Sequence, residues 1–211
     1  MESESQNFFS PRTGMGNNED RSSFPGQKGI VIWMTGLSGS GKSTIAERVE
    51  EHLKASSKVV FRLDGDDLRS GINKDLGFSE ADRTENIRRA AHIAALFRKA
   101  GIIVLCSFIS PTQKMRDMAR SIIGPGHFIE VYVKAGRAAC AKRDPKGLYR
   151  ANTQGLTGVS SPYEEPKSPD ILLDTEVLSI GDSVDLVVCA ILRSIDESLS
   201  NRDPKHSDDN Q

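Results

Sequence analysis

The sequence predicts an α/β fold in which a parallel sheet is covered by helices on both faces, giving three layers. Two observations carry this prediction. Short apolar runs typical of buried strands alternate along the chain with segments of helical periodicity. In addition, a glycine-rich loop at residues 36–43 lies between the first apolar run and the first helical segment. A chain of 211 residues suffices for one such domain with a substantial core.

The first half of the chain is expected to form two strands and two long helices. Residues 30–34 and 59–63 are apolar runs of strand length, and a helical segment runs from residue 43 to about residue 55 between them. Ser79 stands three residues before Asp82 in a capping-box pattern that starts the next helix, and Gly101 ends it. The buried stripe of this helix is predicted to consist of Ile87, Ala90, Ala91, Ala94 and Phe97.

The second half continues with three more strands, expected at residues 102–107, 127–133 and 170–174. Pro111 is expected to open a helix that ends near residue 122, because proline suits the first helical turn. Further helices are expected at residues 136–143 and 183–199. The stretch 144–169 is rich in proline, glycine and polar residues and is too long for a plain connection, so it is predicted to be a lid.

Both ends of the chain lack this pattern. Residues 1–27 are expected to be a disordered arm, residues 28–200 the folded domain and residues 201–211 a flexible tail. The arm has neither the apolar region of a signal peptide nor an arginine-rich transit pattern. No run approaches the roughly 18 apolar residues of a membrane span. We therefore expect a cytoplasmic protein that does not bind membranes.

Charge and cysteine content narrow the function classes. The formal net charge is -1, so no global field favours nucleic acid or a membrane surface, and any anion site must be local. Cys106, Cys140 and Cys189 lie singly, without C-x-x-C spacing. They are expected to be reduced residues of the core or of helices, with no redox or metal role.

The glycine-rich loop matches the phosphate-binding pattern G-x-x-x-x-G-K-[ST]. Its glycines allow successive backbone N–H groups to point at phosphate oxygens beside the positive end of a helix dipole. Lys42 is expected to reach the β- and γ-phosphates of a nucleoside triphosphate, and the Ser43 hydroxyl to bind Mg²⁺. The residues predicted to bind ATP here are Gly36, Leu37, Ser38, Gly39, Ser40, Gly41, Lys42, Ser43 and Thr44.

Three other interpretations of the loop are weaker. A glycine-rich turn without a ligand does not account for the strand before the loop and the helix after it. A dinucleotide site needs glycine where Thr44 stands. A GTPase switch is disfavoured because no Asn-Lys-x-Asp signature occurs, and Asp75 comes one position too early after Asn73 and Lys74.

Carboxylates at the end of the second strand point to the same edge of the sheet. In open parallel sheets, ligands gather at the carboxyl ends of strands, and Asp64 and Asp66 follow the second strand as the glycine-rich loop follows the first. Asp66 is predicted to organise Mg²⁺ or to accept a proton from an attacking hydroxyl. The alternative is that Asp66 only stabilises a helix N-terminus, which contributes about 0.5 to 1 kcal/mol.

A cluster of arginines, amides and one aromatic residue follows. Arginine binds phosphate or sulfate bidentately, amides fix orientation and an aromatic face stacks on a base, so we predict a second, anionic substrate site. Arg88, Arg89 and Arg98 are better explained as a solvated helix face. The residues predicted for the site are Arg69, Asn73, Phe78, Arg83 and Asn86.

Several segments together resemble the adenylylsulfate kinase family. The similarity spans residues 28–174 and includes Leu63-Asp64-Gly65-Asp66-Asp67-Leu68-Arg69, Asp82-Arg83-Thr84-Glu85-Asn86-Ile87-Arg88-Arg89, Phe108-Ile109-Ser110-Pro111 and Arg143-Asp144-Pro145-Lys146-Gly147-Leu148-Tyr149. The resemblance implies a P-loop kinase fold, ATP and Mg²⁺ as cofactors, and commonly a homodimer. It also implies phosphorylation of the 3′-hydroxyl of adenosine 5′-phosphosulfate (APS) by ATP in sulfate activation.

The resemblance assigns further site residues. Asp66 corresponds to the family acid near the 3′-hydroxyl, and Arg69, Asn73, Phe78, Arg83 and Asn86 to residues of the substrate pocket. Arg143 and Lys146 correspond to residues near the nucleotide phosphates, and Ile109 to a pocket residue. Ser110 aligns with a serine marked as a phosphorylated intermediate in some members. Direct transfer needs no such intermediate, so a pocket-lining or turn role for Ser110 stays open.

The chain departs from the family pattern in the lid. The lid is shorter here, and Leu156 replaces a phenylalanine expected to stack on the substrate adenine. Leucine keeps apolar contact but loses the π-face, a change of about 1 kcal/mol. Two alternatives therefore stay open: a P-loop kinase for another small molecule, and a non-catalytic ATP-binding regulatory relative.

Overall fold

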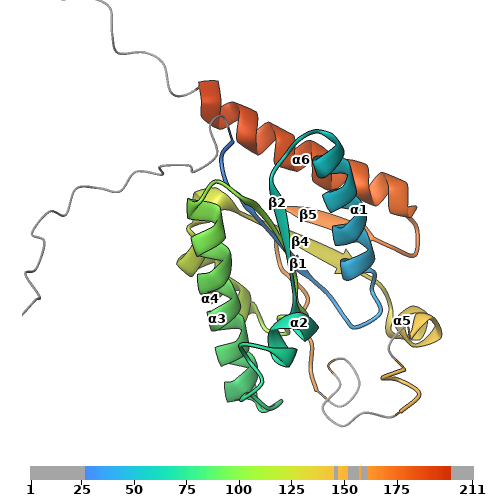
Figure 1. Cartoon of the computed structure of the whole chain (residues 1–211). Coiled ribbons are helices and arrows are strands. Elements are labelled where there is room, and N and C mark those ends of the chain that lie inside the picture. The colour runs from blue at the N-terminus through green and yellow to red at the C-terminus, as the bar shows by residue number, and fades with distance from the viewer. Residues whose placement is uncertain (1–26, 145–146, 152–156, 158–160, 201–211) are drawn as a thin grey trace, which may run out of the picture.

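The computed structural model describes residues 27–144, 147–151, 157 and 161–200. These residues form a five-stranded parallel sheet with helices on both faces, as predicted (Figure 1). The strands are β1 Val31–Thr35, β2 Val60–Asp64, β3 Ile103–Ser107, β4 Phe128–Lys134 and β5 Ile171–Asp174. The helices are α1 Lys42–Ala55, α2 Gly65–Ser70, α3 Glu80–Lys99, α4 Gln113–Ile123, α5 Arg137–Arg143 and α6 Ile180–Ser200, with a 3-10 turn η1 at Pro125–His127.

The strands lie in the order β2-β3-β1-β4-β5, so β1 is the centre of the sheet. All five residues of β1 are buried, which explains why its sequence is a continuous apolar run without alternation. Because all strands are parallel, their carboxyl ends share one edge. The turn between β1 and α1 and the helices α2 and α5 lie at this edge, at the lower end of the sheet in Figure 1.

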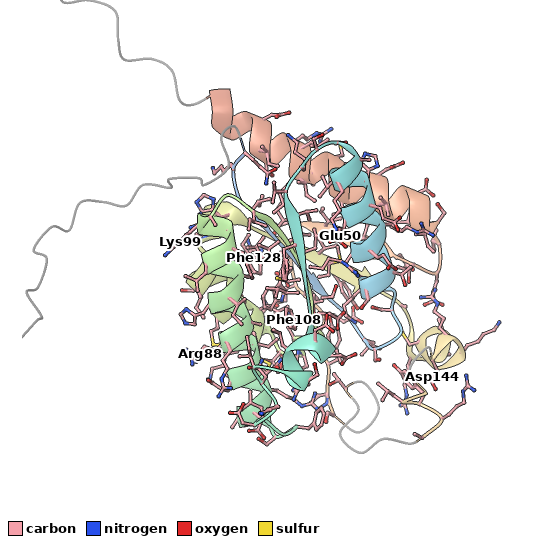
Figure 2. All side chains as sticks on the ribbon, in the orientation of Figure 1. Glu50, Arg88, Lys99, Phe108, Phe128 and Asp144 are labelled. Carbon is pink, nitrogen blue, oxygen red and sulfur yellow. The ribbon has the colours of Figure 1, made fainter. Side chains whose placement is uncertain are left out.

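The side chains of the sheet divide the core into two clusters. Ile32 and Met34 belong to the cluster that α1 and α6 cover, whereas Val31 and Trp33 belong to the cluster that α3 and α4 cover. In the second cluster Trp33 stacks on Phe108 and on Phe128, with ring centroids 5.0 and 5.8 Å apart. Phe108 and Phe128 lie in the core between the sheet and α3 (Figure 2). Apolar packing on both faces therefore fixes the carboxyl edge on which the site is built.

Two helix starts differ from the expectation. The helix expected at Pro111 begins at Gln113, because the Thr112 hydroxyl caps it by accepting a hydrogen bond from Met115 N. Helix α6 begins at Ile180 and not at residue 183, since the Ser179 hydroxyl accepts from the backbone N–H of Asp182. The expected N-cap of α3 is confirmed, with the Ser79 hydroxyl accepting from the backbone N–H of Asp82.

Two residues were expected to be exposed or disordered and are instead part of the folded core. Gln27 was assigned to the arm, but its side chain donates to Val59 O at 2.8 Å and to Gly101 O at 2.7 Å. Arg98 was assigned to a solvated face, but it is only 7% exposed. The Gln27 amide therefore links the start of β2 to the end of α3, so Gln27 is part of the folded domain.

The remaining parts of the predicted arm and tail, residues 1–26 and 201–211, lie outside the described residues. Cys106 of β3 and Cys140 of α5 are buried and Cys189 of α6 is exposed, which confirms their expected placement in the core or on helices. Among the described helices, none combines the length and the apolarity that a membrane crossing needs.

Candidate active site

The glycine-rich loop is held tightly between β4 and α5. Gly36 has a φ of 148°, and a Cβ there would lie 2.3 Å from Val133 O. Gly39 has a φ of 80°, and a Cβ there would lie 2.9 Å from Cys140 O. Glycine is required at both positions because a side chain would be strained and would also collide with backbone. The loop that the sequence predicts to bind phosphates is thus packed closely against the backbone of β4 and α5.

Lys42, the first residue of α1, points back into this loop. Its ammonium donates to Gly36 O at 2.9 Å and to Leu37 O at 2.7 Å, and the residue is 8% exposed. The Ser40 hydroxyl beside it is buried and makes no hydrogen bond within the described part of the chain. A buried cation and a buried hydroxyl lacking a bond are groups that phosphate oxygens would satisfy. The loop therefore fits the predicted triphosphate.

The outer side of the loop is bound by α5 and by the turn after β5. Arg143 donates to Ser40 O at 3.3 Å, to Thr175 Oγ1 at 2.9 Å and to Thr175 O at 2.8 Å. Thr175 Oγ1 also donates to Ser40 O at 3.0 Å. These contacts support the loop from outside, and a direct contact of Arg143 with nucleotide stays a prediction.

The carboxylate that meets the loop is Asp64, the last residue of β2. Ser43 Oγ donates to Asp64 Oδ2 at 2.8 Å, and the backbone N–H of Asp66 donates to Asp64 Oδ1 at 3.0 Å. Asp66 itself is exposed in the first turn of α2. Asp66 therefore occupies a helix N-terminus, as the alternative interpretation expected. It also lies at the same edge of the sheet as the glycine-rich loop, so the catalytic role stays a prediction.

The residues around Ser43 fit Mg²⁺ when phosphate is also available. Ser107 is paired in register with Asp64, and its buried hydroxyl makes no hydrogen bond with the described residues. No group of three or more His, Cys, Asp or Glu within those residues is arranged to hold a metal. A hydroxyl and one or two carboxylates would fill only some of the coordination positions of Mg²⁺ and leave the others to phosphate and water. This is the usual coordination of Mg²⁺ in phosphoryl-transfer sites.

The predicted acceptor residues come together next to α2 and the start of α3. The Arg69 guanidinium lies 4.5 Å from the centre of the Phe78 ring, and that of Arg83 lies 5.8 Å from it. Arg69 donates to Gly77 O at 2.9 Å and Arg83 to Phe78 O at 2.9 Å, so both side chains are held in place. The Phe78 ring remains 64% exposed. The cluster thus offers two cations and an open aromatic face.

Two buried amides lie behind this cluster. Asn73 Nδ2 donates to Asn86 Oδ1 at 2.9 Å, and the two residues are 0% and 6% exposed. Asn73 Oδ1 is buried without a hydrogen bond in the described structure. The pair joins the chain after α2 to α3, which fixes the spacing of the arginines on either side.

Electrostatics favour an anion at the arginine cluster. Burial lowers the pKa of Arg83, and the positive charge of Arg69 lowers it further. Burial also lowers the pKa of Arg69, partly offset by Asp66 and Asp82. Two guanidinium groups whose charges are partly desolvated and repel each other would be stabilised by a bound phosphate or sulfate.

Other arginines of α3 have partners on the surface. Arg89 donates to both carboxylate oxygens of Asp75, at 2.8 and 2.9 Å, and also to Glu85. Arg88 donates to Glu85 at 2.7 Å. The interpretation of these two as a helix face, outside the substrate site, is therefore supported.

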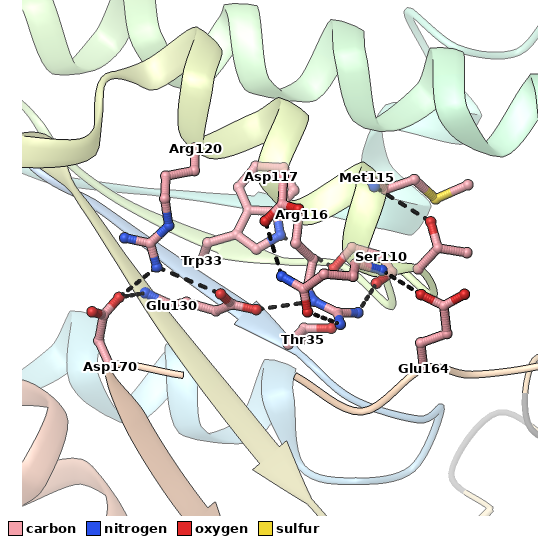
Figure 3. A network of polar contacts seen from close by, with 12 residues as sticks. Trp33, Thr35, Ser110, Met115, Arg116, Asp117, Arg120, Glu130, Glu164 and Asp170 are labelled. Carbon is pink, nitrogen blue, oxygen red and sulfur yellow. Dashed lines mark hydrogen bonds and ion pairs between the residues drawn. The ribbon is translucent and has the colours of Figure 1, made fainter. Parts of the chain in front are cut away.

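The segment after β3 is more buried than its predicted role suggests. Ser110 is 1% exposed with a φ of 37°, and its hydroxyl accepts a hydrogen bond from Trp33 Nε1 at 3.2 Å (Figure 3). Ile109 O accepts from Thr35 Oγ1 at 2.7 Å. In this arrangement the Ser110 hydroxyl supports the turn and does not face an open pocket. Its catalytic assignment stays a prediction that the placement does not favour.

A buried ionic network holds the same segment (Figure 3). Arg116 of α4 is 0% exposed, pairs through Nε with Glu130 Oε1 at 3.0 Å, and donates to Ser110 O at 2.9 Å. Arg120 pairs with Asp170 at 2.8 Å and more distantly with Glu130 at 3.5 Å. Burial raises the pKa of Glu130, although both arginines act in the opposite direction. The network thus connects α4 and β4 to the turn beside the site.

The lid is described only in part. Lys146 and Leu156, both predicted site residues, lie outside the described residues. Thr157 is described, and its hydroxyl accepts from Arg83 at 2.8 Å, so this part of the predicted lid reaches the acceptor cluster. Tyr149 and Tyr163 also contact the site, although neither was among the predicted site residues. Tyr149 ends one of the segments that carry the family resemblance, which was the available signal, whereas Tyr163 lies in an irregular segment without a motif.

Comparisons with known proteins agree with this geometry. A family model for adenylylsulphate kinase matches residues 28–174. An adenylyl-sulfate kinase of Geotalea uraniireducens is 51% identical over 167 residues, covering 77% of this chain and 80% of the relative. A probable adenylyl-sulfate kinase of Bacillus subtilis is 46% identical over 179 residues, covering 83% and 90%.

The same family appears among solved structures. The APS kinase CysC of Mycobacterium tuberculosis, solved in complex with AMPPNP and APS, superposes with a TM-score of 0.75 at 42% identity. The match covers 79% of this chain and 99% of that one. Since the family model spans most of the chain and the relatives are matched over most of their length, the chain belongs to the adenylylsulphate kinase family.

Proposed function

We propose that the protein transfers the γ-phosphoryl group of ATP to the 3′-hydroxyl of APS, giving 3′-phosphoadenosine 5′-phosphosulfate and ADP in sulfate activation. The observation that carries this proposal is the pairing of two different anion sites at one edge of the sheet. One is the glycine-rich loop with Lys42, and the other is the cluster of Arg69, Phe78 and Arg83. A triphosphate fits the first, and an aromatic nucleotide with an anionic end fits the second.

The donor side acts by positioning and charge. The backbone N–H groups of the loop and the Lys42 ammonium hold the phosphates and neutralise the negative charge that develops during transfer. Mg²⁺, bound through the Ser43 hydroxyl and near Asp64 and Asp66, supplies further charge neutralisation when present.

The acceptor side supplies the attacking hydroxyl. Arg69 and Arg83 bind the phosphosulfate, the Phe78 ring stacks on the adenine, and Asn73 and Asn86 set the spacing between the arginines. Asp66 takes the proton of the 3′-hydroxyl while the oxygen forms its bond to the γ-phosphorus and the bond to the β-phosphate oxygen breaks. The Phe78 ring is open to solvent, which suits a stacking partner.

We also propose a homodimer, in keeping with the family pattern, and sedimentation velocity would test it directly. A single boundary at the mass of the 23.1 kDa chain would reject the dimer.

A coupled ADP-release assay tests the activity, with APS and adenosine 5′-monophosphate compared as acceptors. Of the two acceptors, only APS is expected to be phosphorylated, because adenosine 5′-monophosphate lacks the sulfate that the arginines bind. Arg83→Ala should raise the KM for APS by about 10- to 100-fold with a smaller change for ATP, as expected for the loss of a charge-assisted contact. Equal turnover of both acceptors would indicate a different small-molecule kinase, and ATP binding without turnover would indicate a regulatory protein.

A further inference from the structure

The predicted lid joins the fold through two limbs that contact opposite sides of the site. We define the outgoing limb as residues 147–151, after α5, and the returning limb as residues 161–165, before β5. Each limb carries one tyrosine whose hydroxyl reaches the edge of the sheet: Tyr149 contacts Ser38 of the glycine-rich loop, and Tyr163 contacts Thr35 at the end of β1.

The outgoing limb contacts the donor side. Tyr149 OH donates to Ser38 O, in the middle of the glycine-rich loop, at 2.9 Å. A planar trans peptide points its C=O and its N–H in opposite directions, so fixing the Ser38 carbonyl also fixes the direction of the N–H of Gly39. That N–H is one of those expected to bind phosphate. Asp144 orders the start of the limb. Its carboxylate accepts from the N–H of Tyr149 at 3.2 Å, and its backbone carbonyl accepts from the N–H of Gly147 at 3.1 Å.

The returning limb contacts residues 109–113 after β3, which we call the acceptor wall because the family resemblance makes Ile109 a residue of the substrate pocket. Tyr163 OH lies 3.0 Å from Thr35 Oγ1, and Thr35 Oγ1 donates its only proton to Ile109 O, so Tyr163 must be the donor to Thr35. The N–H of Glu164 donates to Pro111 O at 2.8 Å. The Glu164 carboxylate accepts from the N–H of Gln113 at 2.8 Å.

This hydrogen-bond chain ends on the acceptor wall and not on the phosphate loop. Thr35 is the last residue of β1 and is paired with Tyr132 in the sheet, so its backbone is fixed whether or not Tyr163 is bonded. The part that Tyr163 orients is the Thr35 hydroxyl and, through it, the carbonyl of Ile109. The Tyr163 ring is held separately, because it stacks on Tyr132 with centroids 6.2 Å apart.

We infer that Tyr149 and Tyr163 are positioning residues that divide the lid between the two substrates. Tyr149 orients the loop that binds ATP, and Tyr163 orients the wall that binds the acceptor. The assignment of the acceptor rests on the proposed function, whereas the donor half rests on the contact with the phosphate loop alone.

Two hydroxyl deletions of the same kind test the division. Tyr149→Phe should raise the KM for ATP about three- to tenfold and leave the KM for APS within about twofold, as expected for one neutral hydrogen bond. Tyr163→Phe should show the reverse pattern. Tyr132→Phe is the matched control for the packing of the returning limb. It removes a hydroxyl of the same aromatic stack that interacts with Glu165 of this limb and, within the described residues, not with Ser38 or Thr35. Both KM values should stay within about twofold in this variant.

Direct binding separates this inference from the proposed function. Calorimetric titration of each variant with ADP should show weaker binding in Tyr149→Phe and unchanged binding in Tyr163→Phe, whatever the acceptor is. If the parent protein does not turn over APS, the proposed function fails while the ADP titration still decides the donor half. Parallel weakening of both substrates in either variant, an inverted pattern, or no effect in either variant would overturn the division.

Discussion

Removing the carboxylate of Glu130 should destabilise the domain strongly, because it leaves the charge of Arg116 buried without its ionic partner. Both side chains are almost fully shielded from water, at 5% and 0% exposure. Breaking such a pair by removing one member costs about 3 to 5 kcal/mol. For Glu130→Ala we expect the lower end of this range.

The lower end follows from the contacts that remain. Arg116 would keep its hydrogen bonds to Ser110 O and to Gln113 Oε1, both at 2.9 Å, which partly satisfy the guanidinium. Arg120 would lose little, since its closer partner is Asp170 at 2.8 Å, near the surface. Burial already raises the pKa of Glu130, so the neutral isostere Glu130→Gln should cost less than alanine, about 1 to 2 kcal/mol.

Urea unfolding at 25 °C and pH 7.5 measures these costs directly. A loss of about 3 kcal/mol in Glu130→Ala should also lower Tm by roughly 6 to 12 °C in a domain of this size. Asp117→Ala is the matched control, because Asp117 is an exposed acid on the same helix that accepts a hydrogen bond from Gln113, and it should cost less than about 0.5 kcal/mol. A cost below about 1 kcal/mol for Glu130→Ala, or a cost equal to that of the control, would show that the buried pair of Glu130 and Arg116 does not stabilise the domain.

Three further predictions concern the site and its surface. Lys42→Ala should abolish phosphoryl transfer with little change in Tm, measured by ADP release and thermal denaturation, because the ammonium serves the phosphates more than the core. Asp66→Asn should lower kcat by about two to four orders of magnitude, whereas Asp64→Asn should mainly raise the Mg²⁺ concentration needed for half-maximal rate; steady-state kinetics at varied Mg²⁺ separates them. The bonds from its arginine neighbours lower the pKa of Glu85 to about 2 from 4.5, so the folded state binds this proton less readily than the unfolded state. Its stabilisation is therefore present above pH 4.5 and lost as the pH falls towards 2, and Glu85→Gln should flatten the dependence of Tm on pH in that window.

Each of these predictions has a clear contrary result. Near-normal turnover in Lys42→Ala with unchanged Tm would reject the loop assignment. A drop in kcat of less than tenfold in Asp66→Asn would leave Asp66 as a helix-terminal acid only. For Glu85, a variant whose Tm falls as steeply with acid as that of the parent protein would show that the surface pairs with arginine contribute nothing measurable.

Much of the fold follows from local signals in the sequence. Residues 30–34 are apolar throughout because β1 is buried on both faces at the centre of a parallel sheet. The capping pair Ser79 and Asp82 fixed the start of α3 correctly. The start of α4 was placed two residues early, because both Pro111 and Thr112 are compatible with a helix start and only the three-dimensional contact of the Thr112 hydroxyl decides between them.

The site was predictable where chemistry is confined to one motif or to one edge of the sheet. The loop of residues 36–43 and the cluster around Phe78 meet this condition, as do the acids after β2. Other contacts join segments far apart in the sequence, such as Thr35 with Tyr163 and Arg83 with Thr157. No spacing rule relates such residues, so only the folded chain brings them into view. Arg98 was misjudged for the same reason, since helical position alone did not show what packs over it.

Phosphorus NMR of the reaction product shows which group receives the phosphoryl group, and so it tests the proposed phosphorylation of the 3′-hydroxyl of APS. The protein is incubated with ATP, Mg²⁺ and APS, and the product is compared with authentic 3′-phosphoadenosine 5′-phosphosulfate. We expect a new phosphomonoester signal at the position of the 3′-phosphate, formed in equal amount with ADP. ADP formed with inorganic phosphate alone, or a phosphate ester at another position, would contradict it.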